Sequence, residues 1–105
     1  MTEITKSISD RHFKIVIDGH ADSAEYGKDL VCCALSTLTF TLISYRENQA
    51  DKGRIINFTT HIREKDGYIC LECDLIHNSV EEGIEAITQG YDLLQENYKK
   101  YIKIS

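Results

Sequence analysis

Proline and tryptophan are absent from this chain of 105 residues, which also has only one methionine and six glycines. Without proline, turns must come from glycine and short polar residues, and a proline-rich linker between domains is excluded. Hydrophobic residues make up 42% of the chain and charged residues 28%, the composition of an ordinary globular protein. We therefore expect a single domain that spans residues 1–105.

Long hydrophobic runs are also missing. The longest uncharged run, Leu30 to Tyr45, is shorter than the roughly 20 apolar residues that cross a bilayer, and it contains serine, threonine and cysteine. The N-terminus lacks the basic start and apolar core of a secretion signal. These features exclude a membrane-spanning protein, and they predict a cytoplasmic protein with no membrane partner.

Positive charge is in deficit. Twelve Lys and Arg residues stand against 17 Asp and Glu, so the net charge is −5 at pH 7. Proteins that bind nucleic acid need clustered Lys and Arg to replace phosphate counterions, and only the tail around Lys99, Lys100 and Lys103 is locally basic. We expect no direct contact with DNA or RNA. An acidic protein remains suited to a basic protein partner.

Four cysteines, at positions 32, 33, 70 and 73, are the candidate metal or redox residues. Without a secretion signal we expect them to be reduced thiols. Cys70 and Cys73 lie in a segment that alternates like a strand, so their sulfur atoms should point to opposite faces rather than converge on one zinc ion. The sequence therefore predicts neither a metal site nor a cofactor.

The hydrophobic pattern predicts four strands and two helices. Alternating apolar residues indicate strands over residues 2–8, 12–18, 55–62 and 68–75, and Asp66-Gly67 is typical of a tight turn between antiparallel strands. Apolar residues spaced by three or four predict a helix from Asp29 to about Glu47 and a second helix that starts at Ser79, where Ser79 and Glu82 form a capping-box pattern. Loops are expected at residues 19–28 and 48–53.

This order, ββαββα, predicts a two-layer α+β sandwich, in which an antiparallel sheet carries both helices on one face. The other face must be solvated or covered by a partner subunit, so we expect a homodimer. No role is predicted for the histidines at positions 12, 61 and 77, and those at 12 and 61 are expected to be exposed.

One segment, GHADSAEYGKDLVCCALS from Gly19 to Ser36, combines a histidine with a cysteine near a predicted helix start. The helix dipole and free backbone N–H groups in a first turn favour a thiolate, and a nearby histidine would activate it as a nucleophile. The helical wheel places Cys32 on the flank of the apolar stripe and Cys33 on the far side, which favours Cys32. The spacing alone leaves open a surface histidine and an inert buried cysteine.

The same segment resembles the ribosomal-processing cysteine protease family, Prp. The family motif is Gly-His-Ala, a short loop, and Gly-x-Asp-[Ile/Leu]-Val-Cys-Ala-x-x-Ser, and the resemblance covers essentially the whole chain. It implies that Cys32 is the catalytic nucleophile and His20 the general base and acid. Asp29 and Ser36 match recurrent motif positions; Asp29 either orients His20 or is an acidic residue at the helix start. Cys33 stands where the family more often has alanine.

The loop from Ala21 to Lys28 is the expected lid over the substrate. Gly19 and Gly27 are its candidate hinges, although both can equally serve as tight-turn glycines. Tyr26 is a candidate to line a pocket for an aromatic substrate residue.

The resemblance implies a specific reaction, in which the enzyme removes a short N-terminal extension from ribosomal large-subunit protein 27, beside an aromatic pair. Two alternatives remain open. One is a non-catalytic, ribosome-associated module that binds a protein. The other is a redox-sensing thiol protein that uses the adjacent pair Cys32 and Cys33.

Overall fold

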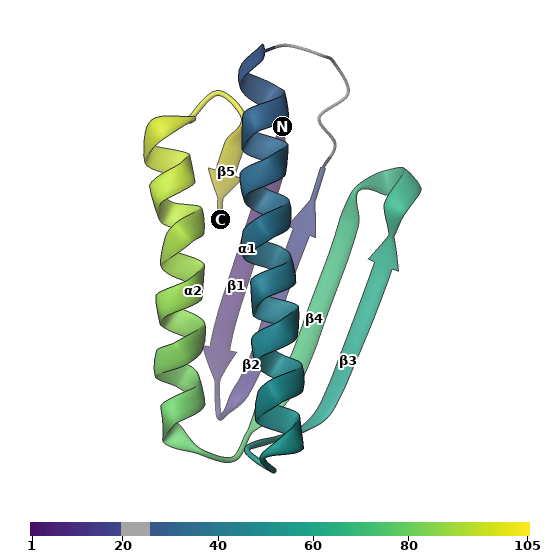
Figure 1. Cartoon of the computed structure of the whole chain (residues 1–105), viewed down its shortest axis with the longest axis vertical. Coiled ribbons are helices and arrows are strands. Elements are labelled where there is room, and N and C mark those ends of the chain that lie inside the picture. Colours follow the sequence, from purple (N-terminus) through teal and green to yellow (C-terminus); the bar gives the residue numbers. More distant parts are fainter. Residues whose placement is uncertain (20–25) are drawn as a thin grey trace.

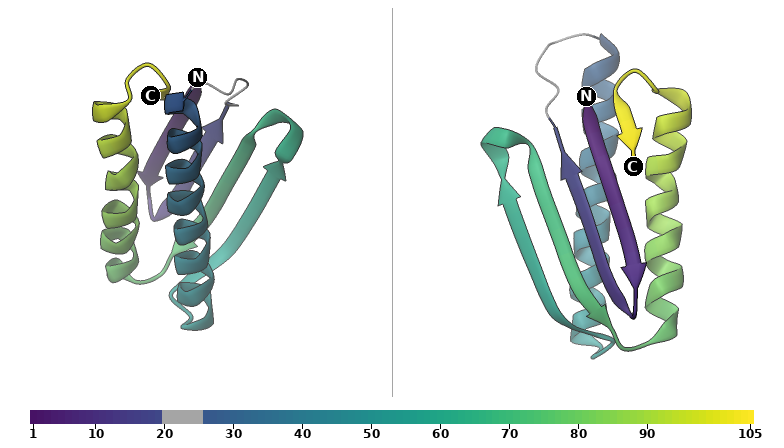
Figure 2. Two further views of the ribbon diagram at one scale, coloured as in Figure 1. Left: turned by 45° about the horizontal axis from the view of Figure 1, so that its top comes forward. Right: turned by 180° about the vertical axis from the view of Figure 1, so that it is seen from behind.

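The computed structural model describes residues 1–19 and 26–105, with the side chains of residues 26–29 excepted. Two helices cover one face of a five-stranded sheet (Figures 1 and 2), with strand order β3-β4-β2-β1-β5. The predicted α+β sandwich with the order ββαββα is confirmed. The elements are β1 (Thr2–Ser9), β2 (His12–Asp18), α1 (Tyr26–Asp51), β3 (Ile55–Arg63), the short 3-10 helix η1 (Glu64–Asp66), β4 (Tyr68–Leu75), α2 (Asn78–Asn97) and β5 (Ile102–Ile104).

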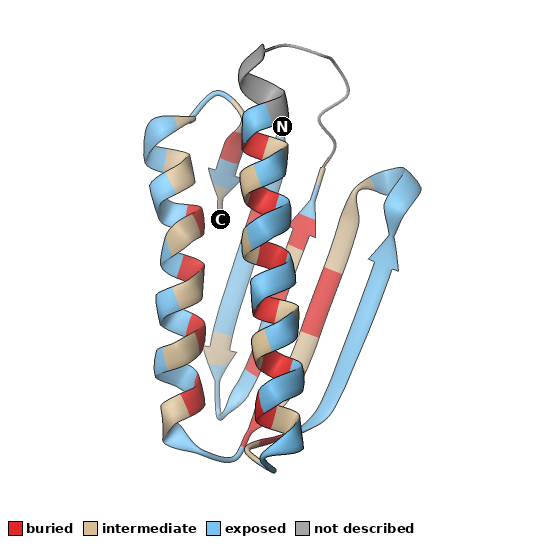
Figure 3. Ribbon diagram, viewed as in Figure 1, coloured by how far each residue is buried: buried red, intermediate tan, exposed pale blue. Residues whose placement is uncertain are grey.

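The hydrophobic core lies between the sheet and the helices, as the alternating and helical patterns predicted. Figure 3 shows buried residues along the sheet-facing sides of both helices and in the central strands. Burial of such side chains is the main force that holds the two layers together. The buried core residues of the central strands and helices include Phe13, Ile15, Ile17, Val31, Leu35, Leu42, Leu71, Cys73, Leu75, Val80, Ile84 and Tyr91. Among the described residues, no helix is long and apolar enough to cross a membrane.

The fifth strand was not predicted, and it makes the sheet mixed rather than purely antiparallel. β5 pairs with β1 in parallel, with Thr2 opposite Ile102. The Thr2 N–H donates to the Tyr101 carbonyl at 2.8 Å, and the Ser105 N–H donates to the Ile4 carbonyl at 2.9 Å. A strand of three residues is too short to show an alternating pattern, so only its tertiary pairing reveals it.

The first helix is longer than predicted at both ends. It begins at Tyr26 instead of Asp29 and ends at Asp51 instead of Glu47, so the predicted loops 19–28 and 48–53 are shorter. The added residues are mostly polar, and an apolar stripe marks only the part of a helix that packs on the sheet. Gly53 (φ +70°) follows the last turn and donates its N–H to the Ala50 carbonyl at 2.9 Å, a glycine stop typical of helix ends.

The second helix is capped by a residue that the sequence pattern did not indicate. The predicted capping box put the cap at Ser79, whereas His77 is the N-cap and its Nδ1 accepts the Ser79 N–H at 3.1 Å. Histidine is an uncommon cap, so a search for Ser, Thr, Asp or Asn selects the wrong residue.

The sheet face opposite the helices is mostly polar, which corrects the reason given for a homodimer. Exposed residues there include Glu3 and Thr5 of β1 and Lys14 of β2, and a polar face is stable in water without a partner. The homodimer therefore stays a prediction, to be tested by sedimentation.

A histidine for which no role was predicted bridges two carboxylates on this polar face. His12 Nδ1 lies 2.8 Å from Asp74 Oδ1, and His12 Nε2 lies 3.1 Å from Glu72 Oε1. Asn57 donates to the other oxygen of Asp74 at 3.0 Å. Neutral imidazole has one N–H and cannot donate to both carboxylates, so the geometry favours the protonated ring. These hydrogen bonds, first that of Asp74 and then that of Glu72, raise the pKa of His12 above its ordinary 6.5.

This bridge predicts a pH-dependent contribution to stability. Because the pKa of His12 is higher in the folded state than in the unfolded chain, the bridge contributes its full stability at pH values below the unfolded pKa near 6.5. This contribution to stability disappears as the pH rises through the folded-state pKa. We expect the wild type to exceed His12→Gln in urea midpoint at pH 5.5, with a smaller difference at pH 8.5. An equal difference at both pH values would show that the bridge is not formed in solution.

Candidate active site

A cavity of about 340 Å³ lies at the end of the sheet where β2 finishes. Four parts of the chain form it: the start of β1, the end of β2, one side of α1, and the tip of the β3–β4 hairpin (residues 55–75). Its walls are largely apolar, and thiol, hydroxyl and charged groups are placed among them. The lining residues are Thr2, Ile17, Gly19, Cys32, Leu35, Ser36, Thr39, Phe40, Ile62, Arg63, Glu64, Gly67, Tyr68 and Ile69.

Three of these residues follow one another along a single side of α1. Cys32, Ser36 and Phe40 are spaced by four residues, so their side chains lie on successive turns of the same helix face. Cys32 is half-buried, which suits a nucleophile that a substrate must reach but bulk water must not surround. Ser36, which matches the family motif, therefore lines the same cavity as the predicted nucleophile Cys32.

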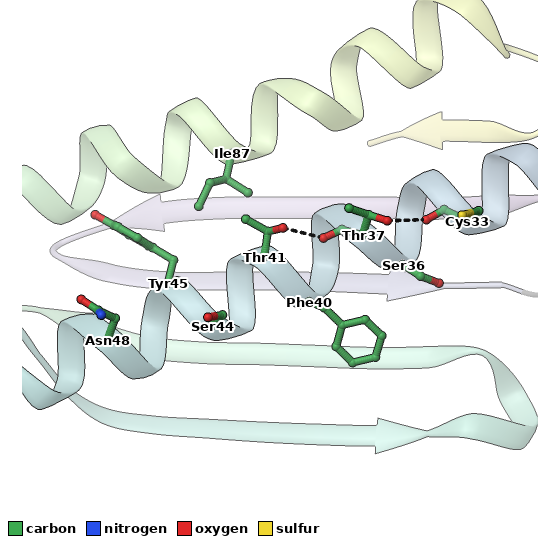
Figure 4. A pocket seen from close by; sticks show the side chains of 9 residues that line it. All are labelled: Cys33, Ser36, Thr37, Phe40, Thr41, Ser44, Tyr45, Asn48 and Ile87. Atoms are coloured by element: carbon green, nitrogen blue, oxygen red, sulfur yellow. Dashed lines mark hydrogen bonds between the residues drawn. The ribbon is translucent and has the colours of Figure 1, made fainter.

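The neighbouring cysteine belongs to a different surface. Cys33 is exposed and lines a larger, open groove of about 790 Å³ along the solvent side of α1 (Figure 4). Ser36 and Phe40 border both hollows, but neither Cys32 nor Gly19 reaches the larger one. The smaller cavity is the candidate active site because it alone joins both ends of the motif. This arrangement agrees with the helical-wheel preference for Cys32.

The position of Cys32 along the helix corrects one expectation. Because α1 begins at Tyr26, Cys32 is its seventh residue and lies in the second turn, not the first. Only the first four N–H groups of a helix lack internal partners, and the dipole effect declines within the first turn. The helix start is thus too far away for the backbone N–H of Cys32 to serve as a free donor.

Gly19 connects β2 to the histidine position of the motif, and its backbone explains why it is glycine. It has φ +137°, and a Cβ built on it would lie 2.3 Å from the Met1 carbonyl oxygen. Its N–H donates to the Gly67 carbonyl at 3.1 Å, which ties the end of β2 to the hairpin tip. The positive φ agrees with the tight-turn alternative for Gly19, whereas the hinge role stays a prediction.

The remaining predicted site residues are only partly within the described part of the chain. His20 follows Gly19 in the sequence but lies outside the described residues. The side chains of Tyr26 and Asp29 lie outside them too, so the pocket role of Tyr26 and both roles of Asp29 stay predictions. Gly27 belongs to α1 rather than to a loop, which removes the reason for treating it as a loop hinge.

The hairpin tip contributes cavity residues that the sequence analysis missed. The Arg63 guanidinium stacks 4.2 Å from the ring centre of Tyr68, and Arg63 Nε lies 3.5 Å from Asp66 Oδ2. Ile62 of β3 and Ile69 of β4 form the apolar wall below them. Their place beside the end of β2 follows once β2 and β4 are known to pair antiparallel, because the start of β4 then adjoins the end of β2. That pairing itself could not be derived.

The other two cysteines occupy positions unsuited to nucleophilic chemistry. Cys70 and Cys73 are buried in β4. Burial raises the pKa of the Cys73 thiol to about 11, against a smaller opposing effect of Arg46.

This contrast predicts the order of alkylation. In a Cys33→Ala background, iodoacetamide should modify Cys32 before Cys70 or Cys73, because the thiolate reacts and must be accessible. Peptide mapping by mass spectrometry reads the order directly. If Cys70 or Cys73 were modified before Cys32, the conclusion that Cys32 is the more accessible thiol would be wrong.

The family model for cysteine protease Prp matches residues 1–103. The chain belongs to the Prp family. Ribosomal processing cysteine protease Prp from two strains of Staphylococcus aureus is 28% identical over 103 residues, which cover 92% of this chain and 96% of that protein. Membership of this family makes the chain a cysteine protease, as the motif predicted.

Solved structures share the fold over the full length. SMU.848 from Streptococcus mutans aligns with a TM-score of 0.77 at 28% identity, covering 100% of this chain and 92% of that one. S. aureus Prp in complex with a substrate peptide aligns with a TM-score of 0.73 at 17% identity. Its complex with a covalently linked product peptide aligns with a TM-score of 0.74 at 19% identity. Each covers 100% of this chain and 98% of the other. These two similarities support the mixed sheet with two helices described above.

Proposed function

We propose that this Prp-family protease removes the N-terminal extension of ribosomal large-subunit protein 27 with a Cys32–His20 dyad. The observation that supports this proposal most is the cavity that contains both Cys32 and Gly19, because Gly19 directly precedes His20 in the chain. Gly19 and Cys32, 13 residues apart in sequence, thus line one cavity. A nucleophile and its base must lie within hydrogen-bond reach of each other in the working enzyme.

The reaction is an acyl transfer in two steps. His20 takes the Cys32 proton, the Cys32 sulfur attacks the scissile carbonyl carbon, and a tetrahedral oxyanion forms. The C–N bond then breaks, and His20 gives its proton to the leaving amine. Water, deprotonated by His20, attacks the thioester, releases the extension as a carboxylic acid and restores the thiol. The covalently linked product peptide of S. aureus Prp supports such an intermediate by similarity of fold.

The oxyanion needs a donor other than the Cys32 backbone. Ser36 is the best placed, since it lines the cavity one turn beyond Cys32. Thr39, the other α1 hydroxyl in this cavity, is paired with the Tyr91 hydroxyl at 2.9 Å. Thr37 and Thr41 line the open groove instead, and they donate to the Cys33 carbonyl at 3.0 Å and the Thr37 carbonyl at 2.7 Å (Figure 4). Within the described residues, the Ser36 hydroxyl makes no such bond and is available to a bound carbonyl. A well-placed donor contributes about 3 kcal/mol to transition-state binding.

The cavity suits an apolar side chain beside the scissile bond. Phe40 and Ile62 are large apolar residues that remain exposed although they face the cavity, and a bound aromatic side chain would cover them. The net charge of −5 favours encounter with a strongly basic ribosomal protein. We also propose that the enzyme acts as a homodimer in the cytoplasm.

A synthetic peptide tests this function. It should carry the extension of the ribosomal protein 27 of the same organism and the first residues of the mature protein. We expect the purified chain to cut it once, beside the aromatic pair, as read by product masses. Replacing both aromatic residues by alanine should reduce cleavage strongly. An uncut peptide, with the folded protein present in excess, would contradict the proposed substrate.

A further inference from the structure

Arg46 is the one charged side chain buried in the part of the chain that the structure describes. Only 4% of it is exposed, and no carboxylate among the described residues forms an ion pair with it. Removing a cation from water costs several kcal/mol unless its hydrogen bonds are replaced. Burial accordingly lowers the pKa of Arg46.

The guanidinium joins α1 to both strands of the β3–β4 hairpin. Its Nη1 donates to the Thr59 carbonyl at 2.7 Å and to the Glu72 carbonyl at 3.3 Å, and its Nη2 donates to Thr60 Oγ1. Thr59 and Glu72 face each other across the hairpin and are the first regular pair after a shift in register that begins at Ile56. Arg46 therefore holds the hairpin where its ladder restarts.

β3 has little else to fix it against the helices, whereas β4 pairs with β2 and adds Leu71, Cys73 and Leu75 to the core. β3 is an edge strand, and only Ile55 of its nine residues is buried. The irregularity after Ile56 includes Asn57 at φ +53°, and such a bulge bends a strand and weakens its pairing locally. Phe58 lies under the guanidinium, 5.4 Å from its carbon to the ring centre. Past Ile55, the hydrogen bonds that join β3 to α1 within the described residues all come from Arg46.

The same hairpin carries one wall of the Cys32 cavity. Ile62, two residues beyond Thr60, lines the cavity opposite Phe40 of α1. We propose that Arg46 is a positioning residue that sets the separation between α1 and the hairpin, and thereby the fit of the cavity to a bulky substrate side chain. This inference rests on the proposed peptidase site at Cys32. Arg46 touches no reacting atom, so it should affect substrate fit rather than the chemical step.

The test is Arg46→Met, which removes the hydrogen bonds but keeps an apolar side chain in the space. With the extension peptide we expect KM to rise about tenfold and kcat to change by less than about twofold. The preference for an aromatic residue over alanine beside the scissile bond should fall by about tenfold. Iodoacetamide should modify Cys32 at an unchanged rate. Arg46→Lys keeps the charge but not the contact with both strands, so its KM should lie between those of the wild type and Arg46→Met.

Two further variants make the outcome decisive. Thr60→Val removes one acceptor without changing shape and should raise KM in the same direction, with no additional effect in the double variant. Arg11→Met, an exposed arginine remote from the cavity, should behave as wild type. Wild-type KM in folded Arg46→Met would overturn the proposal, as would equal losses in kcat and Cys32 alkylation. If Arg46→Met does not fold, Thr60→Val decides by the same criteria.

Failure of the proposed substrate is distinguishable from failure of the Arg46 role. If the wild type cuts no extension peptide, hydrogen exchange tests Arg46 by itself. Amides of residues 59–63 should then exchange faster in Arg46→Met than in Arg11→Met. Equal exchange would overturn the role of Arg46 whatever the substrate is.

Discussion

Replacing Cys32 by serine is expected to reduce cleavage of the extension peptide by about a thousandfold or more, because the attacking sulfur is lost and serine is a far weaker nucleophile at neutral pH. The fold should persist, since the change is one atom in a half-buried side chain. Product masses measure the reaction, and thermal unfolding measures the fold.

The adjacent cysteine supplies the control. Cys33→Ser is the same chemical change one residue later, on the exposed side of α1, and should retain most activity. If Cys33→Ser were inactive and Cys32→Ser active, the assignment of the nucleophile would be wrong. If both were active, neither thiol by itself would be required for the reaction.

The second large effect is expected from Gly19→Ala. A side chain at φ +137° is strained by about 1–3 kcal/mol, and its Cβ would overlap the Met1 carbonyl oxygen at 2.3 Å. Either the end of β2 or the backbone of Met1 and Thr2 must then move. A movement of β2 displaces the attachment point of His20. A displacement of about 1 Å at a catalytic group costs on the order of a hundredfold in rate. We expect such a loss in kcat, together with lower thermal stability.

Gly53→Ala is the matched control for this prediction. Gly53 also has a positive φ, +70°, but a Cβ there meets nothing within 4 Å and the residue does not line the Cys32 cavity. It should lose stability from backbone strain while cleaving normally at a temperature where it is folded. Equal loss of activity in both variants would show that Gly19 acts only through global stability.

Local patterns predicted those parts of the fold that depend on residues close in sequence. β2 and β4 have the predicted bounds because their alternating apolar residues are all directed to one core. The predicted ends of α1 were wrong because its first and last turns are mostly polar and do not extend the apolar stripe that marks a helix in the sequence. The predicted cap of α2 was wrong because His77 is an unusual cap. β5 was missed because its three residues are defined only by pairing with β1.

The site was predictable only as far as its motif. The pair of Cys32 and His20 came from a contiguous segment with a strong family resemblance, and the shared cavity of Cys32 and Gly19 supports it. The hairpin wall of Ile62 and Tyr68 and the buried Arg46 depend on strand order. Which strand lies beside β2 is set by the sum of tertiary contacts, and no local pattern encodes it.

The central claim is that Cys32, assisted by His20, attacks the peptide, and a peptide electrophile tests it most directly. A chloromethyl ketone whose sequence ends at the scissile bond of the extension should alkylate the protein once. We predict that fragmentation of the tryptic peptide Asp29–Arg46, which contains both cysteines, will place the label on Cys32. The rate should fall strongly in His20→Ala, and excess extension peptide should protect the thiol. A label on Cys33, or one equally fast with and without His20, would contradict the account.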